Sequence, residues 1–407
     1  MDRNVQHVTF INKSDIPYIL DCAIKSNLVV HESKRLSIPI THIKPFMTTN
    51  NIKIAIGHDE LKALAGLWES FQTDHFFDQY TWHMKAIEAT NSNNPILICF
   101  LENQRITAIL PLHQYQQKIA GMTYNIIGRY KPDRLNFHNI ITYQKNGTAY
   151  PLKNIHDALK SAGVKYDYLF IDRIFDTERF NLTINDKSSH LKHKHQTSAS
   201  VIECRDGIDG FLSTLSRNRR QKIRQKTRKL SKLGSIRYEI STDASKQTMF
   251  NSLVDMENSG WKGTRGTSLK KDNKQRLFFQ QALAHEEVSV HALKIDDTLI
   301  ASHLSVVSAG IMYIYKIAFD ESYKQYSPGE LLLIETIRHL DSSKIKNINL
   351  VTNLSWHQHL SNASLPLLQC KYYRHNPKGV FLFFITSAYR FYKNIRSSSL
   401  NHKKQSI

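Results

Sequence analysis

Cysteine is scarce in this chain, and no two cysteines stand close together. The four cysteines are Cys22, Cys99, Cys204 and Cys370, and none belongs to a CxxC pair. Such spacing suggests neither a zinc knuckle nor a disulfide framework. We therefore expect a protein of a reducing compartment, the cytoplasm.

Long hydrophobic runs are missing as well. The first 20 residues contain no long apolar core and no small-residue cleavage site, so we expect no signal peptide. The longest apolar run near the end, Val380–Tyr389, has about half the length that a helix needs to cross a bilayer. A peripheral position at the inner face of the membrane is the alternative to a purely cytoplasmic one.

Motifs for nucleotide and metal binding are missing too. The chain has no Walker loop and no GxGxxG motif. The tract HLKHKH brings His190, His193 and His195 together, but no carboxylate or cysteine accompanies them. We therefore predict no metal site.

Acidic residues are outnumbered. The 407 residues include 55 Lys and Arg against 35 Asp and Glu, which gives a formal net charge of +20. Such an excess favours anionic partners, namely nucleic acid, anionic lipid, or phosphate-bearing cofactors and substrates, without choosing among them. The length is sufficient for two domains with full cores.

The apolar pattern predicts an α/β (α+β) protein built from two similar halves. Each half carries a strand hairpin, a third strand, a connection with a helix and one further strand. The segments LICFLENQRITAILPL and HALKIDDTLIASHLSV both alternate apolar and polar residues around a short polar turn, which suggests a degenerate internal duplication. The predicted division is a first domain, a polar linker, a second domain and a basic aromatic terminal segment, over residues 1–184, 185–198, 199–378 and 379–407.

The second half is predicted to begin with one long basic helix over residues 208–233. Apolar positions form a narrow buried stripe along it, and a solvated charged face is the simplest interpretation of the rest. Binding of an anionic substrate, lipid, RNA or CoA phosphates is the alternative. Its basic residues are Arg217, Arg219, Arg220, Lys222, Arg224, Lys226, Arg228, Lys229 and Lys232.

Three segments of this half resemble the signature segments of GNAT-like acetyltransferases of the cellulose-biosynthesis CelD type. They are SRNRRQKIRQKTRKL (216–230), ENSGWKGTRGTSL (257–269) and YKIAFDESYKQYSPGELLLIETI (315–337). The resemblance implies tandem GNAT-like domains, each with a mixed, mostly antiparallel sheet flanked by helices. The first half resembles the degenerate N-terminal repeat of the same proteins, and the tandem layout is similar to that of FemAB aminoacyl-tRNA-dependent transferases.

The resemblance implies a cofactor site at the start of one helix. In the GNAT fold the pyrophosphate of acyl-CoA sits where backbone N–H groups and the helix dipole meet negative charge. Plain helix capping is the alternative for the same residues. The loop has a single glycine, which leaves acetyl-CoA, a longer acyl-CoA or an acyl carrier protein open as donor. The implied cofactor-binding residues are Tyr326, Ser327, Pro328, Gly329 and Glu330.

Lys316 stands out on a predicted strand. Strict alternation over residues 311–319 puts Lys316 on an apolar face and Tyr315 on the opposite one. A lysine in such a place must pair, reach solvent or lose its proton. We expect either a salt bridge, to Asp320 or Glu257, or a catalytic contact with substrate or thioester in the cleft.

Other residues are candidates for the chemistry. The resemblance points Glu257 into the acceptor cleft as general base, the alternative being an ordinary exposed glutamate. His303 could take the acceptor proton near neutral pH, or be a hydrogen-bonded core histidine. Tyr326 could protonate the departing thiolate, or simply pack. Trp261 could form a wall of the acceptor pocket or simply pack in its loop. The candidates for the acceptor pocket are Trp261, Lys262 and Tyr315.

The sequence thus predicts an N-acyltransferase that moves an acetyl or longer acyl group from CoA to an amine or hydroxyl. An amino sugar, a surface-polysaccharide or lipid precursor, or a small amine is the expected acceptor. One alternative is a FemAB-like transferase, because the basic helix and net charge suit tRNA. The other is a non-catalytic binder of anionic membranes or nucleic acid on a GNAT scaffold.

Overall fold

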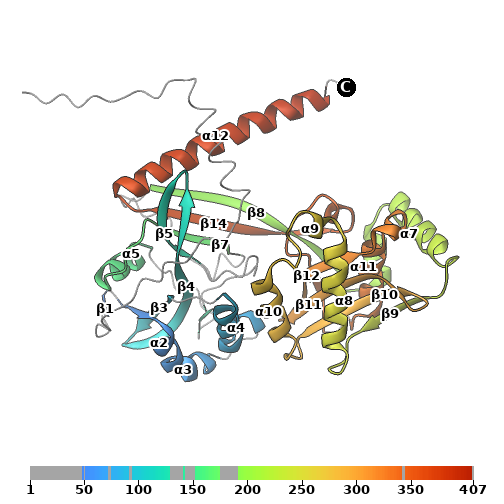
Figure 1. The fold of residues 1–407 in the computed structure, drawn as a ribbon, viewed down its shortest axis with the longest axis horizontal. Helices are drawn as coiled ribbons and strands as arrows, with labels where there is room; N and C mark the ends of the chain where they lie inside the picture. Colours follow the sequence, from blue (N-terminus) through green and yellow to red (C-terminus); the bar gives the residue numbers. More distant parts are fainter. Residues whose placement is uncertain are drawn as a thin grey trace, which may run out of the picture.

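The described strands form one mixed sheet with helices packed on it, as seen in a computed structural model (Figure 1). The sheet has 14 strands, most of them paired antiparallel. The model describes residues 48–49, 51–71, 75–90, 94–128, 141–142, 152–174, 191–341 and 344–405.

The strands of the first half occupy one side of the sheet. From its edge inward they run in chain order, with β6 (Ile141–Thr142) pairing beside β4. They are β1 (Thr48–Thr49), β2 (Ile52–Ile56), β3 (Pro95–Glu102), β4 (Arg105–Ile119), β5 (Met122–Gly128) and β7 (Tyr168–Ile174).

The second half supplies the other side of the sheet. From the opposite edge inward the strands again run in chain order. They are β9 (Ile236–Ile240), β10 (Val288–Ile295), β11 (Thr298–Ser308), β12 (Ile311–Phe319) and β13 (Asn347–Asn349).

Both halves repeat one strand pattern. In the first, β3, β4 and β5 pair antiparallel and β7 then pairs parallel to β5. In the second, β10, β11 and β12 pair antiparallel and β13 then pairs parallel to β12. A helix lies between the strands of each parallel pair, α5 (Leu152–Ser161) in one half and α11 (Pro328–His339) in the other. The predicted fold class, tandem mixed sheets flanked by helices, is confirmed by this repeat.

Two long strands join the halves. β14 (Ala363–Tyr373) pairs with β7 on one side and with β8 (Leu191–Glu203) on the other, and β8 pairs with β13. The prediction of an irregular linker is therefore wrong for residues 191–198, whereas 185–190 lie outside the described residues. The polar composition was misleading because strand pairing uses backbone groups, and the partner strand lies about 170 residues further along the chain.

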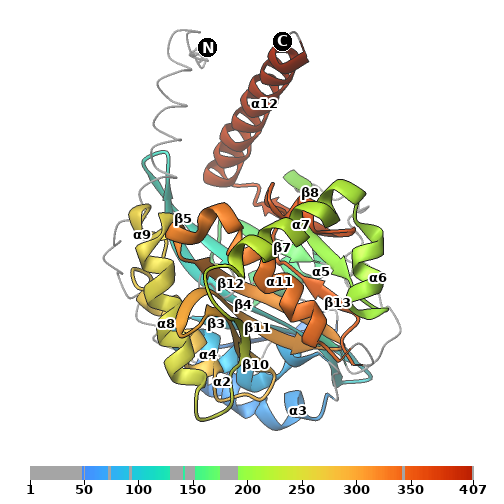
Figure 2. The ribbon, with the colours of Figure 1, turned by 90° about the vertical axis from the view of Figure 1, so that its right-hand side faces the viewer.

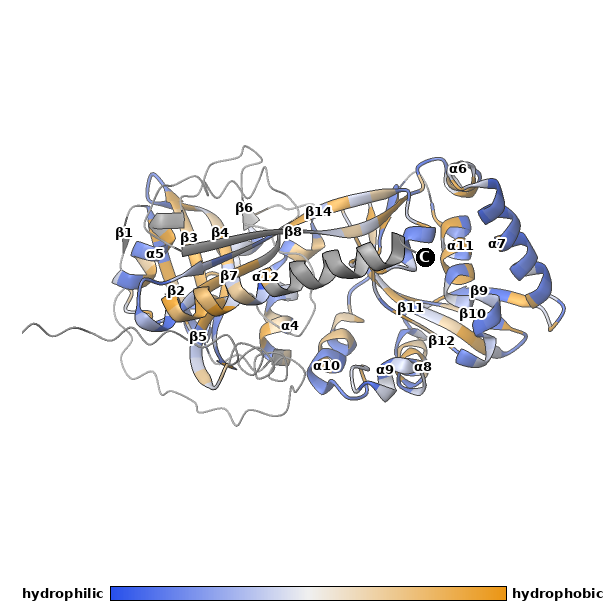
Figure 3. Cartoon of the chain, turned by 90° about the horizontal axis from the view of Figure 1, so that it is seen from above, coloured by the Kyte–Doolittle hydropathy of each residue, from blue (hydrophilic) through white to orange (hydrophobic). Residues whose placement is uncertain are grey.

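Helices cover both faces of the second half (Figure 3). One face carries α8 (Lys246–Ser259), α9 (Trp261–Thr264) and α10 (Asn273–Ala282). The opposite face carries α6 (Gly207–Thr214), α7 (Arg217–Leu230) and α11, which face the viewer in Figure 2. Each face has its own apolar core.

The basic segment forms two helices instead of the single predicted one. α6 ends at Thr214, and α7 starts after Ser216, whose backbone is extended and whose Oγ accepts a hydrogen bond from Arg219 N at 3.2 Å. A serine in this position caps a new helix. The apolar spacing continues across the break at Leu215, which is why the sequence pattern looked continuous.

β12 contains a bulge. Lys316 pairs with Leu304 and Ile314 with Ser305, so Tyr315 is an extra residue in β12. Such an insertion reverses the side that the following residues face. The predicted strict alternation is therefore wrong, and Lys316 lies on the same side as Tyr315.

The two halves also share a core. Phe76 N, in η1 (Phe76–Asp78), donates a hydrogen bond to Ser308 Oγ at 2.9 Å. The rings of Phe77 and Tyr313 lie 4.8 Å apart, centroid to centroid. Helix α4 (Tyr80–Thr90) contacts α10 in the same region, so the first half packs directly against the sheet of the second. Among the described residues, the first half also contains the helices α2 (His58–Ala63) and α3 (Ala65–Glu69).

The last helix, α12 (Pro377–Gln405), follows β14. Its first turns pack on the sheet, where Tyr373 OH and Thr386 Oγ1 lie 2.9 Å apart. The helix then extends away from the body of the molecule in both Figures 1 and 2. Neither α12 nor any other helix among the described residues combines the length and apolarity that crossing a bilayer requires.

Candidate active site

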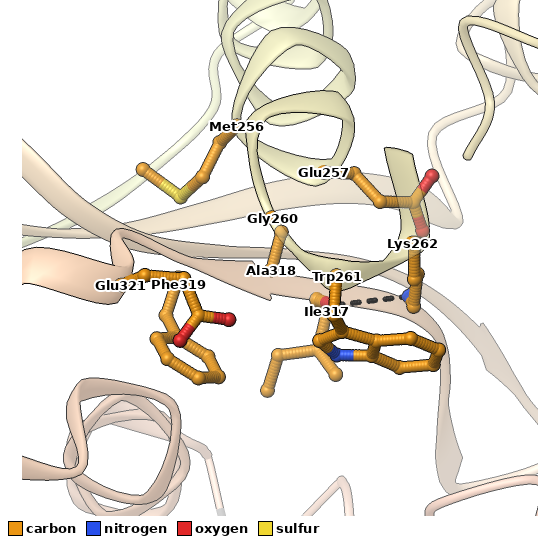
Figure 4. A pocket seen from close by; sticks show the side chains of 9 residues that line it. All are labelled: Met256, Glu257, Gly260, Trp261, Lys262, Ile317, Ala318, Phe319 and Glu321. Atoms are coloured by element: carbon orange, nitrogen blue, oxygen red, sulfur yellow. Dashed lines mark hydrogen bonds and ion pairs between the residues drawn. The ribbon is translucent and has the colours of Figure 1, made fainter. Parts of the chain in front are cut away.

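A surface pocket lies where the end of α8 and the short α9 meet β12 (Figure 4). It is open to solvent, and its empty space, open solvent included, is about 250 Å³. The residues that line it are Met256, Glu257, Gly260, Trp261, Lys262, Ile317, Ala318, Phe319 and Glu321.

The turn between α8 and α9 shapes this pocket. α8 ends at Gly260, whose extended backbone redirects the chain. At Gly263 a Cβ would lie 1.7 Å from Asn258 O, so only glycine fits the close return of the chain. This return brings Lys262 back beside Glu257.

Glu257 and Lys262 form a largely buried ion pair. Glu257 is only 2% exposed. Its Oε1 accepts a hydrogen bond from Lys262 Nζ at 2.6 Å, and its Oε2 accepts one from Leu269 N at 2.7 Å. Both carboxylate oxygens are thus engaged, so Glu257 holds the lysine and the α9 turn in place instead of pointing an unengaged oxygen into the pocket.

Lys262 has capacity left for a ligand. Its ammonium also donates to the carbonyl oxygen of Ile317 at 3.2 Å. An ammonium carries three protons, and within the described part of the chain two of them meet these acceptors. The third can reach a group bound in the pocket, since the side chain lines it and is 21% exposed.

Glu321 lies across the pocket from Lys262, as Figure 4 shows. It starts η2 (Glu321–Tyr326), and a Cβ on Gly260 would lie 3.7 Å from its Oε1. The side chain is exposed, so its carboxylate is accessible from solvent. The residue was not among the predicted site residues, and its position two residues after β12 was the available signal.

Beyond Tyr313, no strand among the described residues pairs with the edge of β12 that faces away from β11. β13 pairs with β12 only along Ile311–Tyr313. The later residues Ile317 and Phe319 line the pocket instead. An extended ligand can bind such a strand edge through backbone hydrogen bonds.

The predicted cofactor loop caps α11. Ser327 has a left-handed backbone, with φ of 53°, and its carbonyl oxygen accepts hydrogen bonds from Glu330 N at 3.0 Å and Leu331 N at 3.1 Å. Pro328 has no N–H, so Gly329 N is the first-turn donor that remains for an anion. The loop therefore offers fewer backbone donors than we expected from the sequence.

Cations from α7 reach this loop. Lys226 Nζ donates to Ser327 Oγ at 2.7 Å and lies 3.1 Å from Glu330 Oε2. Arg219 pairs with the other oxygen of Glu330, which is 8% exposed. Glu330 therefore anchors two basic side chains of α7 at the helix start, a different role from the direct cofactor contact that we predicted.

The loop and the pocket are neighbours across β12. A Cβ on Gly329 would lie 3.7 Å from Ile317 Cδ1 and 3.7 Å from Phe319 Cδ1. Both distances are ordinary van der Waals contacts, so a small side chain fits at this position.

Lys316 and Tyr315 lie outside the pocket, toward α10. The ammonium of Lys316 donates to the amide oxygen of Gln275 and lies 5.9 Å from the centre of the Phe279 ring. Tyr315 packs beside the same ring and that of Phe77. The structure thus places Tyr315 in the contact between the halves and Lys316 against α10, both apart from the group around Glu257.

His303 is a core residue. It is fully buried, stacks on His291 with ring centroids 4.3 Å apart, and its Nε2 lies 2.9 Å from Thr336 Oγ1 of α11. Burial, followed by the charge of His291, holds its pKa well below the usual value. This geometry agrees with the core alternative for His303 and separates it from the pocket.

Tyr326 packs beside Tyr323, with ring centroids 6.4 Å apart, against the core beneath α11. It does not line the pocket. Of the predicted site residues, the structure therefore brings together Glu257, Trp261 and Lys262.

The second half matches a known family. The family model of the acetyltransferase (GNAT) domain covers residues 217–356. This segment runs from the start of α7 to beyond β13, so it includes the pocket and the α11 loop. The resemblance to GNAT acetyltransferases is thereby confirmed for this domain, while the CelD type stays a prediction.

Two solved structures are similar over most of the chain. A protein of unknown function from Bacteroides thetaiotaomicron is 10% identical, with 82% of this chain and 100% of that chain covered and a TM-score of 0.48. FemX is 9% identical, with 77% of this chain and 96% of the FemX chain covered and a TM-score of 0.49. No curated protein matches the chain.

Proposed function

We propose that the second half transfers an acyl group from acyl-CoA to an amine bound in the pocket. The observation that supports this most is the Glu257–Lys262 pair beside the open edge of β12, within the segment that matches the acetyltransferase domain. An amino sugar of a polysaccharide or lipid precursor is the acceptor we favour, because Trp261 offers a 49% exposed aromatic face at the pocket.

The donor would bind across β12. Lys226, the hydroxyl of Ser327 and the N–H of Gly329 offer a cation and hydrogen-bond donors to a phosphate at the positive end of α11. The amide groups of the pantetheine arm would then pair with the open edge of β12. This path ends at Ile317 and Phe319, next to Lys262.

The pocket residues fit the needs of acyl transfer. The amine nitrogen attacks the thioester carbonyl, a C–N bond forms, and the C–S bond breaks. Glu321 accepts the proton that the amine loses, and the third proton of Lys262 stabilises the oxyanion. The thiolate leaves and takes up a proton from water, to which the pocket is open. Glu257 acts through Lys262 as a positioning residue.

The test is a calorimetric titration of the full chain with acetyl-CoA and with a long-chain acyl-CoA. We expect saturable binding that is lost in Gly329→Glu, because the new carboxylate repels the phosphates at the start of α11. Gly329→Ala is the matched control, since a Cβ fits at this position. Binding should persist in that variant.

Two outcomes would contradict the proposal. One is equal affinity of a folded Gly329→Glu variant and the wild type. The other is saturable binding without release of free thiol in the presence of amine acceptors, which would favour a non-catalytic binder. The chain length that binds best would identify the donor.

A FemAB-like transferase remains the second candidate. The observation in its favour is the row of exposed basic residues on α7, coloured hydrophilic in Figure 3. Their number predicts aminoacyl-tRNA binding that weakens steeply with salt. No binding of tRNA at low salt would remove this candidate. The residues are Arg217, Lys222, Arg224, Arg228 and Lys229.

A further inference from the structure

One face of α12 is apolar and exposed. Phe381, Phe384 and Phe391 are 45%, 64% and 69% exposed, and the exposed Ala388 lies between the last two. Steps of three, four and three residues put all four on one face of a helix. We call this face the phenylalanine stripe.

The opposite face of α12 fixes the direction of the stripe. Leu382 is 1% exposed, and Phe383 packs on Tyr373 of β14 with ring centroids 5.5 Å apart. Thr386 adds the contact with Tyr373 OH at 2.9 Å. The sheet therefore holds one side of the helix, and the stripe on the opposite side is exposed to solvent. Figure 2 shows α12 leaving the body of the molecule.

The charged residues of α12 are all basic. Its 29 residues include no Asp or Glu. The six Lys and Arg residues therefore give the helix a formal charge of +6. They are Lys378, Arg390, Lys393, Arg396, Lys403 and Lys404.

We propose that α12 binds the surface of an anionic phospholipid bilayer. The phenylalanine stripe would insert at the boundary between headgroups and acyl chains, with the helix lying along the surface. The net positive charge of the helix would be attracted by the negative surface potential of the lipid phosphates. This proposal rests on α12 alone and holds whether or not the pocket transfers acyl groups.

The positive charge of α12 favours an anionic bilayer over a second copy of the chain as the partner of the phenylalanine stripe. Two α12 helices packed through their stripes would bring two formal charges of +6 together, and like charges at close range repel. An anionic bilayer is complementary to both features at once, since it offers an apolar interior beneath a negative surface.

The test is co-sedimentation of the full chain with vesicles. Vesicles of phosphatidylcholine alone are compared with vesicles of equal parts phosphatidylcholine and phosphatidylglycerol. We expect binding to the anionic vesicles that is weaker at high salt. The double variant Phe384→Ser/Phe391→Ser should bind at least about tenfold more weakly, because it removes the largest exposed part of the stripe.

The matched control is Ile240→Ser/Leu277→Ser, which removes two apolar side chains of 47% and 42% exposure elsewhere. It should bind anionic vesicles like the wild type. Absence of binding by the wild type, or equal binding by the stripe variant, would overturn the proposal. A dimer in light scattering that dissociates in the stripe variant, without vesicle binding, would assign the stripe to self-association instead.

Discussion

The ammonium of Lys262 lies 2.6 Å from the buried carboxylate of Glu257. The same ammonium contacts the backbone of β12 at Ile317 O. One lysine therefore connects the end of α8 with the strand edge that lines the pocket. This relationship makes separate predictions for stability and for activity.

Lys262→Met should lower both the stability of the protein and its acyl-transfer activity. The change leaves the Glu257 carboxylate, 2% exposed, with Leu269 N as its remaining hydrogen-bond donor. We expect a loss of about 2 kcal/mol in the free energy of unfolding. Acyl transfer should fall about 100-fold, since a donor to the oxyanion is lost. Urea denaturation and a thiol-release assay measure the two effects.

Lys270→Met is the control for the stability effect. Lys270 pairs with Asp255 at 2.9 Å, but the two side chains are 53% and 67% exposed. Exposed pairs contribute about 0.5 kcal/mol or less. Equal losses in the two variants would mean that the Glu257 pair has no special role.

Glu321→Gln should slow the reaction while leaving the fold unchanged. The amide keeps the shape of the side chain but cannot accept the proton of the amine, so we expect kcat to fall about 100-fold. The free energy of unfolding should not change, because the residue is exposed. Glu286→Gln, another exposed glutamate, is the control. Wild-type turnover of the Glu321 variant would place the base elsewhere.

The chain should lose stability as the pH falls below about 6.5. Burial lowers the pKa of His83 to about 4 and that of His291 to about 3, and it holds the pKa of His303 well below its usual value. Below the unfolded pKa of about 6.5 the unfolded state binds protons that the folded state does not. Stability is thus fully present above that pH and decreases by about 1.4 kcal/mol per pH unit for each such histidine.

Denaturant unfolding at pH 7 and pH 5 measures this effect. His291→Asn should reduce the difference between the two pH values, because one of the buried histidines no longer titrates. His359→Asn changes an exposed histidine and should leave the difference as it is. An unchanged pH dependence in His291→Asn would show that other groups cause it.

The local pattern predicted much of the fold. The apolar pattern predicts a helix over residues 246–259, a strand over 123–127 and a helix over 152–162. Helix α8 has these bounds, Lys246–Ser259, and β5 and α5 differ from theirs by no more than one residue at an end. These elements have strong apolar periodicity bounded by turn residues, which local sequence encodes directly. β8 was missed because its pairing with β14 depends on residues far along the chain.

The site was predicted only in part, because some of its residues carry a local sequence signal and others do not. Trp261 and Lys262 stand in a glycine-bounded turn after a helix, a local signal that the sequence carries. Tyr315 and Lys316 were misplaced because the bulge in β12 is visible only in the register with β11. Glu321 was missed because nothing local links it to α8.

Composition and short-range spacing are enough to predict the basic character of the chain, its strongly periodic helices and strands, its duplicated halves and the place of the α11 loop. Three further features become visible only in the folded chain. They are the joining of the halves by β8 and β14, the anchoring of α7 by Glu330, and the pocket shared by Glu257, Lys262 and Glu321. Each of these depends on contacts between segments distant in sequence, whose geometry arises only when the chain packs.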